Sequence, residues 1–396
     1  MRRTTVLGLM AVPLCIAGFY WLMLHGYLEL TAYLLGLTVL GLLVACAWEW
    51  RHGHRRWAAV LLAGALLTGG TVGTYGWELN KKLDNIHRIN DADLQKGNRP
   101  EKGPTKALNI LLLGSDSRDP NAEQTIADSL ADGTWTPGQF NSDTMMVVHI
   151  PADRKAAYVV SIPRDDYVPI YDAEGVRHGS NKINSAFSNY GPFGSWRTVE
   201  NLSGLRLDHL AIIDFAGFRE LTSAIGGVDV YVPQTVYDDK QDQQWDQGWT
   251  HLEGDLALKY VRMRHGLLNG DFDRVARQQN FLRAVMDKTL EDGTIGNPFK
   301  LSHVLDAITT HLTVDESWTS SQIRGLALSL QNLSARKVTF LTLPLDHYET
   351  LPGAGAVNII DEVRARAMWK AVRDDDMAGY VKAHPEDELS DPHDVS

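Results

Sequence analysis

Three long apolar runs follow one another at the start of the chain, at residues 6–24, 27–48 and 57–77. Each is close to the ~20 residues that an α-helix needs to cross the ~30 Å hydrocarbon core of a bilayer. A cleavable signal peptide would need a small-residue cleavage site before a soluble segment, but the chain becomes apolar again directly after His25 and Gly26. We therefore predict that residues 1–80 form a membrane anchor with three transmembrane helices.

The basic residues of this segment predict its orientation. Arg2 and Arg3 precede the first run, and a basic cluster at residues 51–56 separates the second run from the third. Because Lys and Arg collect on the cytoplasmic side, we expect the amino terminus in the cytoplasm and everything after Trp77 outside the cell membrane. Both cysteines fall within predicted spans, so the outer part must be held together by its core alone.

Charge separates the two parts of the chain. Residues 1–82 carry seven Lys and Arg against three Asp and Glu, out of 38 and 49 in the whole chain, so the remainder has a net charge of −15. Binding to nucleic acid in general needs a basic surface that displaces counterions from phosphates. We therefore expect the membrane as a partner and no nucleic acid.

The outer part divides into a linker, a domain and a tail. Residues 81–105 are polar and contain Gly and Pro near their end, which predicts an extracytoplasmic linker. Residues 106–380 alternate β-rich runs with helical patterns, which predicts an α/β domain with a central mixed β-sheet flanked by helices. Residues 381–396 are acidic and lack aromatic side chains, which predicts a disordered tail.

Within the domain, apolar and helical periodicity places the elements. Residues 258–264 are expected to be a strand or an extended segment, and Asp361 is expected to cap the last helix. The other expected strands are residues 107–113, 144–150, 156–162, 209–213, 228–232 and 338–343. The expected helices are residues 195–202, 215–225, 272–290, 298–311, 320–333 and 361–373.

Charged residues lie at the ends of three expected strands. Asp116 and Arg118 follow the first strand, Asp143 stands directly before the second, and Arg164 and Asp165 follow the third. Each alone is compatible with a turn or capping residue. Together they indicate a shared site, because ligands of such sheets collect beyond the carboxyl ends of strands.

A stronger signal is the pair Arg262 and Arg264. If the segment is extended, the two guanidiniums lie on one face and repel each other unless an anion lies between them. Downstream, Asp271 precedes a helical stripe with two cations, an amide and an aromatic ring: Arg274, Arg277, Gln278 and Phe281. The alternative is a solvated basic face paired with Asp271 and Asp273, and this stretch alone does not decide between the two.

Together, these acids and arginines suit a pyrophosphate group. Asp116 and Asp143 would hold a hard cation such as Mg²⁺, with Mn²⁺ as an alternative, because Mg²⁺ binds one or two carboxylates plus phosphate oxygens. The arginines would neutralise charge on a leaving phosphate. The sequence has no Gly-x4-Gly-Lys-Ser/Thr loop and no Gly-x-Ser-x-Gly elbow, so neither an ordinary nucleoside triphosphatase nor an elbow-type serine hydrolase is indicated.

Eight short motifs follow in order between residues 107 and 290: Leu-Leu-Gly-Ser-Asp-Ser-Arg, Ser-Asp-Thr, Ser-Ile-Pro-Arg-Asp, Lys-Ile-Asn, Gly-Gly-Val-Asp-Val, Leu-Glu-Gly-Asp-Leu-Ala-Leu, Tyr-Val-Arg-Met-Arg and Asp-Phe-Asp-Arg-Val-Ala-Arg-Gln-Gln. Each is weak alone, but in this order they resemble the LytR–CpsA–Psr (LCP) family of cell-envelope glycopolymer transferases. The resemblance implies transfer of a glycopolymer from a polyprenyl-pyrophosphate carrier to peptidoglycan. A phosphodiester would be formed and polyprenyl phosphate released.

The resemblance also implies roles for single residues. Asp116 and Asp143 match the acids that bind Mg²⁺. The groups that grip the lipid pyrophosphate match Arg164, Arg262, Arg264 and Gln278, to which we add Arg274 and Arg277. Arg164 is also assigned to catalysis, together with Asp116, Arg118 and Asp271. Asp165, Lys182 and Asn184 match further motif positions without a firm individual role.

The sequence departs from the family pattern in two places. Asn141 stands where the family usually has Arg, so one guanidinium is missing from the expected clamp. Either Arg118 or another cation compensates, or the acceptor side of the site differs. Residues 122–139 also form a long polar insertion.

The expected reaction is attack by a muramyl hydroxyl on the phosphorus next to the glycan, with Asp116 or, as second choice, Asp271 taking up the proton. The apolar segments 183–187, 215–225 and 281–290 either line a groove for the isoprenoid tail or are ordinary core. Two other interpretations stay open. One is a polyprenyl-pyrophosphate hydrolase, and the other is a lipid-binding regulatory membrane protein without catalytic activity.

Overall fold

The computed structural model describes residues 28–95, 98–117, 126–131, 135–267, 271–291, 298–330 and 333–395. The chain divides into two compact units. The first comprises Met1–Asn85 and Thr289–Asp306, and the second comprises Ile86–Lys288 and Ala307–Ser396.

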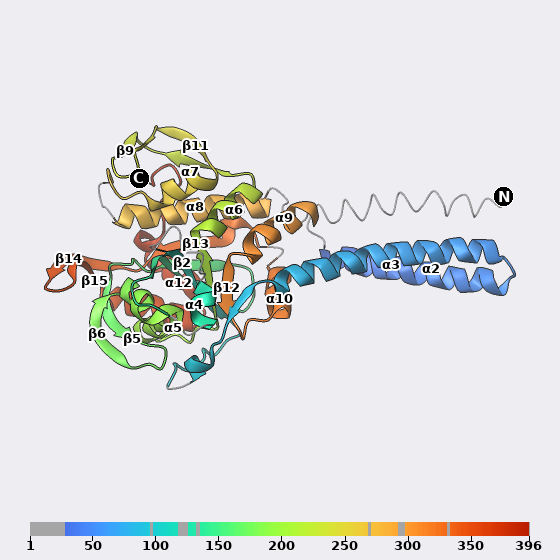
Figure 1. Ribbon diagram of the computed structural model, residues 1–396, viewed down its shortest axis with the longest axis horizontal. Helices are drawn as coiled ribbons and strands as arrows, with labels where there is room; N and C mark the ends of the chain where they lie inside the picture. The colour runs from blue at the N-terminus through green and yellow to red at the C-terminus, as the bar shows by residue number, and fades with distance from the viewer. Residues whose placement is uncertain are drawn as a thin grey trace. The chain divides into compact units, whose positions relative to one another are not determined.

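Two long helices make up most of the first unit. Helices α2 (Leu28–Arg51) and α3 (Arg55–Asp84) lie side by side and antiparallel (Figure 1). In the turn between them, His54 Nδ1 lies 2.7 Å from Glu49 Oε2. At the other end of α3, Lys82 Nζ lies 2.7 Å from Asp306 Oδ2 on helix α9 (Pro298–Thr309).

One stretch of the described chain is long and apolar enough to cross a membrane, namely Tyr33–Arg51 within α2. It covers most of the second predicted span. The third predicted span, 57–77, is helical in α3. Its many Gly and Thr residues lower its mean hydropathy, so it is not apolar enough to count as a candidate span. The first, 6–24, lies outside the described residues. The chain therefore has one described apolar helix suited to membrane anchoring, and the three predicted spans are not confirmed.

A seven-stranded mixed sheet organises the second unit, with strand order β1-β12-β7-β2-β3-β4-β13. The central strand β2 pairs in parallel with β7 on one side and antiparallel with β3 on the other. The strand bounds are β1 His87–Ile89, β2 Leu108–Ser117, β3 Phe140–Ile150, β4 Ala157–Ser161, β7 His209–Asp214, β12 Leu312–Asp315 and β13 Val338–Thr342. This confirms the predicted α/β class with a central mixed sheet.

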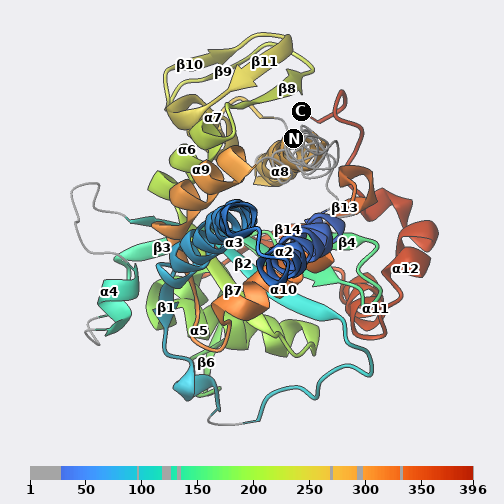
Figure 2. The same cartoon turned by 90° about the vertical axis from the view of Figure 1, so that its right-hand side faces the viewer.

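Helices cover both faces of the sheet (Figures 1 and 2). Because strand side chains alternate between faces, Leu111 and Leu113 of β2 join one core cluster while Leu112 packs with the other. The first cluster includes side chains of α5 (Asn184–Ser203), α11 (Glu362–Arg373) and α12 (Met377–Ala383). The opposite face carries α6 (Phe215–Ala224), α7 (Gly254–Arg262) and α8 (Asp271–Glu291).

The remaining elements are short. Helix α4 (Ile126–Ala131) lies in the predicted insertion, and α10 spans Ser320–Ser329. Two-stranded ribbons are formed by β5 (Tyr167–Tyr171) with β6 (Arg177–Lys182), β8 (Val228–Val232) with β11 (Gly248–Leu252), β9 (Val236–Asp238) with β10 (Gln243–Trp245), and β14 (Leu345–Leu351) with β15 (Gly355–Ile360).

Apart from residues 258–264, the expected strands and helices are present with shifted ends. The largest shift is in α5, which begins at Asn184 rather than at residue 195. Gly191 has φ 72° inside it and Pro192 follows, so two helical pieces are joined at a kink that the sequence pattern marks as a break. Asp361 caps α11 as predicted, its side chain accepting from the N–H groups of Val363 and Arg364.

Residues 86–105 of the predicted linker belong to the second unit, whereas residues 81–85 belong to the first. Strand β1 adds to the sheet edge beside β12, and Leu94 is fully buried in the core. Arg99 reaches the buried carboxylate of Glu200 on α5, with Nη2 2.6 Å from Oε1. The polar composition of this stretch does not reveal these contacts, because the partners lie at least about a hundred residues away in sequence.

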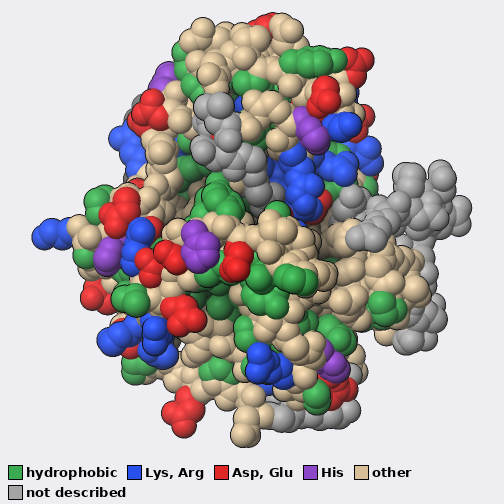
Figure 3. Space-filling model, turned by 90° about the vertical axis from the view of Figure 1, so that its left-hand side faces the viewer, with side chains coloured by type: hydrophobic (Ala, Val, Ile, Leu, Met, Phe, Trp, Pro, Cys, Tyr) green, Lys and Arg blue, Asp and Glu red, His purple; other side chains and the backbone are tan. Residues whose placement is uncertain are grey.

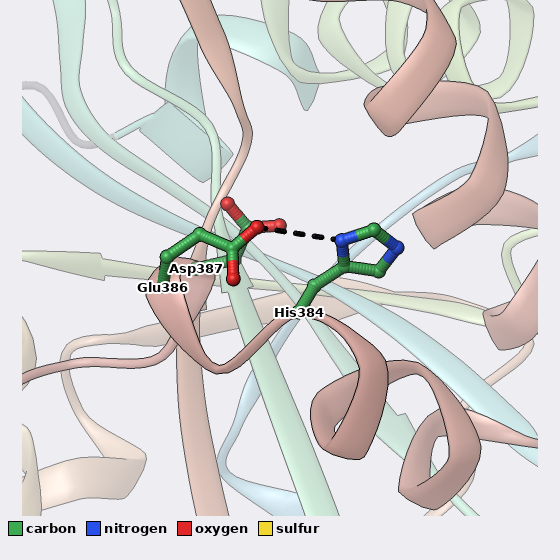
Figure 4. A group of neighbouring side chains, drawn as sticks. All are labelled: His384, Glu386 and Asp387. Atoms are coloured by element: carbon green, nitrogen blue, oxygen red, sulfur yellow. Dashed lines mark hydrogen bonds and ion pairs between the residues drawn. The ribbon is translucent and has the colours of Figure 1, made fainter.

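The predicted disorder of residues 381–396 is wrong for the described part of this tail. Leu389 N–H donates to Phe340 O at the sheet edge, and Val395 is 2% exposed. Figure 4 shows His384, Glu386 and Asp387 side by side. Asp387 is ion-paired with Arg364 and accepts from the Tyr380 hydroxyl at 2.6 Å, and burial raises the pKa of that hydroxyl. These contacts hold the tail against α11 and α12.

Candidate functional site

A cavity of about 350 Å³ lies between the sheet and helices α6, α7 and α8. Its wall is mostly apolar and includes Phe215, Phe218 and Leu221 of α6, Leu258 and Val261 of α7, and Phe281 of α8. Pockets of this size accept organic ligands of moderate size. Of the three apolar segments expected either to line a groove or to be ordinary core, two, 215–225 and 281–290, contribute residues to this cavity. The third, 183–187, is buried in the core on the opposite face of the sheet.

Five of the predicted site residues line the same cavity: Asp143, Arg262, Arg264, Arg274 and Gln278. They come from β3, the end of α7, the segment after it, and α8. Figure 3 shows Lys and Arg side chains gathered on one face of the molecule. An apolar chamber with guanidiniums and a carboxylate at its wall suits an amphipathic anion.

The end of β2 meets β3 at the sheet side of the cavity. The pairing of the two strands shifts between Gly114 and Ser115, which leaves Gly114 opposite Thr144. A Cβ at Gly114 would lie only 3.0 Å from Thr144 Cβ, so the glycine of this motif allows the close approach. Both residues line the cavity, and Asp143 follows directly in the wall.

Arg164 joins the site through Asp143. Strand β4 ends at Ser161, and Arg164 in the turn beyond it donates from Nη1 to Asp143 Oδ1. Asp165 lies between Arg164 and Lys182, with Lys182 Nζ 3.1 Å from Asp165 Oδ1 and Arg164 Nε 3.8 Å from Asp165 Oδ2. The four charges alternate in sign, so each holds its neighbours in place. Asn184 contributes here by its backbone, whose N–H donates to Arg164 O.

The prediction that residues 258–264 are extended is wrong. They lie in and just after α7, which ends at Arg262, and Met263 has extended dihedrals. Arg262 and Arg264 reach the same cavity because the helix ends between them. The Arg262 guanidinium lies 4.4 Å above the Phe215 ring, a cation–π contact that places it at the cavity wall.

Helix α8 is held against the sheet by Gln279. Its Nε2 donates to Ser161 Oγ and to Leu341 O, both at 2.7 Å. On the neighbouring stripe, Arg274 and Gln278 face the cavity, and Gln278 Nε2 donates to Val261 O at 3.2 Å. Three members of this stripe, Arg274, Gln278 and Phe281, therefore line the cavity.

Arg277 belongs to the predicted pyrophosphate-binding stripe, but it is not among the described residues that line the cavity. It is 1% exposed. Its Nη1 lies 2.8 Å from Met263 Sδ, and its guanidinium lies 5.0 Å from the Tyr260 ring centre. Burial lowers the pKa of Arg277 and raises the pKa of Tyr260. Arg277 thus ties α8 to α7 behind the site.

Three predicted residues are not placed in full. Arg118 lies outside the described residues, as do the side chains of Asp116 and Asp271. The backbone of Asp116 pairs with Asn141 near the end of β2, two residues from Asp143. Asn141, which stands where the family usually has Arg, is therefore paired with Asp116 in the sheet. Asp214, at the end of β7, is a polar residue of the wall that the sequence analysis missed, although it too follows an expected strand.

Substitutions of Arg277 and Arg262 should distinguish an arginine that stabilises the fold from one that lines the cavity. We expect Arg277→Met to lower the free energy of unfolding by about 2–4 kcal/mol, because it removes the buried link between α7 and α8. Arg262 is exposed, so Arg262→Met should change stability by less than about 1 kcal/mol. Chemical denaturation of both variants measures the two changes. Equal midpoints would contradict a structural role for Arg277 that Arg262 does not share.

The amino-acid sequence is similar to one protein family and to named proteins of bacterial cell-wall synthesis. A model of the LytR_cpsA_psr family matches residues 75–374. The cell wall biosynthesis protein LcpA of Corynebacterium glutamicum is 33% identical over 316 residues, covering 72% of this chain and 58% of LcpA. TagV of Bacillus subtilis, named as a polyisoprenyl-teichoic acid–peptidoglycan teichoic acid transferase, is 30% identical over 277 residues, covering 67% and 66%. This chain thus spans about three fifths of the length of LcpA.

Solved structures share the fold. The crystal structure of B. subtilis TagV aligns with a TM-score of 0.55 at 24% identity, covering 69% of this chain and 98% of that one. TagT bound to LI-WTA aligns with a TM-score of 0.52 at 23% identity, covering 70% and 96%. At these identities the likeness concerns the arrangement of the sheet and its helices.

Proposed function

Because the chain belongs to the LytR_cpsA_psr family, we propose that it transfers a glycopolymer from a polyprenyl-pyrophosphate carrier to peptidoglycan. The observation that carries the proposal is the cavity with an apolar interior and charged residues in its wall. A polyprenyl chain needs apolar walls, and its diphosphate needs guanidiniums. The names of TagV and of TagT bound to LI-WTA agree with this substrate class.

In the proposed reaction, the isoprenoid tail occupies the space between α6, α7 and α8. Arg262, Arg264 and Arg274 bind the diphosphate oxygens, for which the planar guanidinium fork is well suited. A sugar hydroxyl of the acceptor forms a new bond to the phosphorus next to the glycan, and the bond from that phosphorus to the bridging oxygen breaks. Polyprenyl phosphate leaves with the bridging oxygen. The hydroxyl proton passes to a carboxylate, for which Asp116 is our candidate.

The residues present fit a hard cation. Asp143 offers a carboxylate in the cavity wall, and the backbone of Asp116 lies two residues away across the β2–β3 pairing. Asp143 and Asp116 would hold Mg²⁺, which would supply charge neutralisation at the phosphate oxygens. Arg164 meanwhile neutralises the Asp143 carboxylate and keeps it in position.

The membrane arrangement belongs to the same proposal. We propose the three spans and the cytoplasmic amino terminus of the sequence analysis, with Tyr33–Arg51 as the second span. The catalytic domain would then lie outside the cell membrane, where polyprenyl-linked glycans meet peptidoglycan.

The test uses the full chain in detergent with a polyprenyl-pyrophosphate-linked glycan, Mg²⁺ and peptidoglycan. Glycan joined to peptidoglycan through a phosphodiester, detected by mass spectrometry after digestion, would support transfer. Glycan released only into solution would indicate the hydrolase instead. Binding without any turnover would indicate the regulatory protein.

Narrowing the cavity should weaken binding of the lipid chain of the donor. Leu258→Trp adds an indole to the wall, so contacts with the isoprenoid tail are lost at about 0.8 kcal/mol for each methylene displaced. We expect KM for a long-chain donor to rise at least about tenfold, and KM for a short-chain analogue to rise less. Leu328→Trp, on α10 and 39% exposed, is the matched control. Equal effects on both chain lengths would contradict a lipid-binding role for the cavity.

A further inference from the structure

The β14–β15 ribbon is an exposed feature that the proposed reaction does not yet use. Residues 346–350 on β14 are all exposed, and Tyr348 is 58% exposed. A two-stranded ribbon is barely stable in water by itself, so this one must be held by other parts of the domain. It stands at the edge of the molecule in Figure 1 and belongs to the face shown in Figure 3, where Lys and Arg side chains gather.

The middle of the ribbon is attached to the turn that carries Arg164, since Asn358 pairs with Tyr348. Asn358 on β15 donates its backbone N–H to Asp165 O at 3.0 Å, and its Nδ2 donates to Asp166 Oδ1 at 3.0 Å. Asn358 is 3% exposed and Asp166 is 2% exposed, so these hydrogen bonds are shielded from water. The ribbon therefore keeps a fixed position relative to Arg164 and, through its ion pair, to Asp143.

The ribbon also contacts the first turn of α8. The Tyr348 ring meets the Phe272 ring edge to face, with centres 6.0 Å apart and planes at 89°. Phe272 lies two residues before Arg274, which lines the cavity. Two independent contacts, one to the Arg164 turn and one to α8, thus place the ribbon beside the charged side of the cavity.

The exposed side chains of β14 have the chemistry of a saccharide-binding surface. Tyr348 presents an aromatic ring with a polar tip, and such rings bind amphipathic partners with little loss of side-chain freedom. Next to it, His347 Nδ1 lies 2.8 Å from Asp346 Oδ2, and Glu349 follows. These polar groups suit the hydroxyl groups of a sugar, while the ring suits its C–H face.

We infer that the β14–β15 ribbon is the wall of the acceptor subsite and that Tyr348 packs against an uncharged sugar of the acceptor glycan strand. The inference rests on the proposed function. In the proposed reaction the leaving lipid phosphate is bound at the cavity. An acceptor hydroxyl that attacks in line with it must therefore approach from the solvent side, where the ribbon lies. Asp346 and Glu349 would repel a phosphate-rich donor polymer but not the N-acetylated sugars of a glycan strand.

The test compares Tyr348→Ala with Tyr348→Phe in the full chain. We expect Tyr348→Ala to raise KM for the acceptor about tenfold, the loss of roughly one aromatic contact, with KM for the lipid-linked donor within about twofold. Tyr348→Phe keeps the ring and should recover most of the acceptor affinity. Trp249→Ala, which removes a 64% exposed aromatic side chain from the β8–β11 ribbon, is the control for general loss of surface aromatic rings.

A binding measurement keeps this inference separate from the proposed function. Soluble N-acetylglucosamine oligomers are titrated by NMR into the wild-type chain and the Tyr348 variants without any donor. Weakened binding by Tyr348→Ala alone supports the subsite even if no transfer is detected. Unchanged binding, an equal loss in Trp249→Ala, or a rise in donor KM rather than acceptor KM would overturn it.

Discussion

Asp143→Asn is expected to lower kcat/KM for glycopolymer transfer by roughly 10²–10³-fold. Asp143 is the one predicted acid whose side chain is described in the cavity wall, and its carboxylate is bound by Arg164. The amide keeps the shape but removes the charge, so it neither holds Arg164 in place nor offers a carboxylate to Mg²⁺. Steady-state transfer at saturating Mg²⁺ measures the effect, with thermal unfolding as a check on folding.

A double-mutant cycle tells whether Asp143 and Arg164 act as one unit. Arg164→Lys retains a positive charge but loses the guanidinium fork, so we expect a smaller loss of about tenfold to a hundredfold. If the two residues act together, the double variant should be little worse than Asp143→Asn, because effects within a unit are not additive. The exposed pair Arg219 and Asp255, 3.0 Å apart, serves as the matched control. Full transfer by Asp143→Asn would refute its assignment.

The strand ends of the site could be predicted from the sequence because each belongs to an unbroken apolar run. Leu111 and Leu113 are buried on one face and Leu112 faces the other, so the run identifies a strand covered on both sides. The first polar residues after or before such runs then lie at the sheet edge. In the structure, Asp143 lies within β3 and in the cavity wall, and Arg164 lies just beyond β4 and binds the Asp143 carboxylate.

The conformation around Arg262 could not be predicted in the same way. The alternation of charge in Tyr260-Val261-Arg262-Met263-Arg264 suggests an extended segment, but Ala257, Tyr260 and Val261 are buried at helical spacing. Their partners come from α6 and α8, so tertiary packing decides the conformation. Arg277 shows the same limit, because its burial depends on Tyr260 and Met263 rather than on its own helix.

Contacts between distant segments explain the remaining differences. Residues 92–99 look like a polar linker, yet Glu200, the partner of Arg99, is buried on α5 about a hundred residues further along the chain. The tail looks disordered because its acids are plentiful, yet Asp387 is taken up by Arg364 and Tyr380. Composition describes an isolated segment, and it cannot report a partner that the fold supplies.

Glu200→Ala should lower the free energy of unfolding by about 3–5 kcal/mol. The Glu200 side chain is fully buried, accepts from Arg99 Nη2 at 2.6 Å and Nε at 3.1 Å, and also accepts from the Leu207 N–H at 3.1 Å. Arg197 Nη1 lies 3.9 Å from the same carboxylate. Removing Glu200 leaves two guanidiniums in the interior without their acid, and burial already lowers the pKa of Arg197. Guanidinium titration of the full chain measures the loss.

Lys102→Ala is the matched control, since Lys102 pairs with Asp208 at 2.7 Å but is 61% exposed. An exposed pair of this kind contributes only about 0–1 kcal/mol. The buried pair should also help to keep residues 86–105 attached, because Arg99 links this segment to α5, in addition to Arg197, which donates to Leu94 O and Asn98 O. In Glu200→Ala, proteases should therefore cut within 86–105 before the rest of the domain unfolds. Equal midpoints for the two variants would mean that the buried pair adds no more stability than the exposed one. An uncut segment in Glu200→Ala would mean that the other contacts of this stretch, such as those of Leu94, are enough to keep it attached.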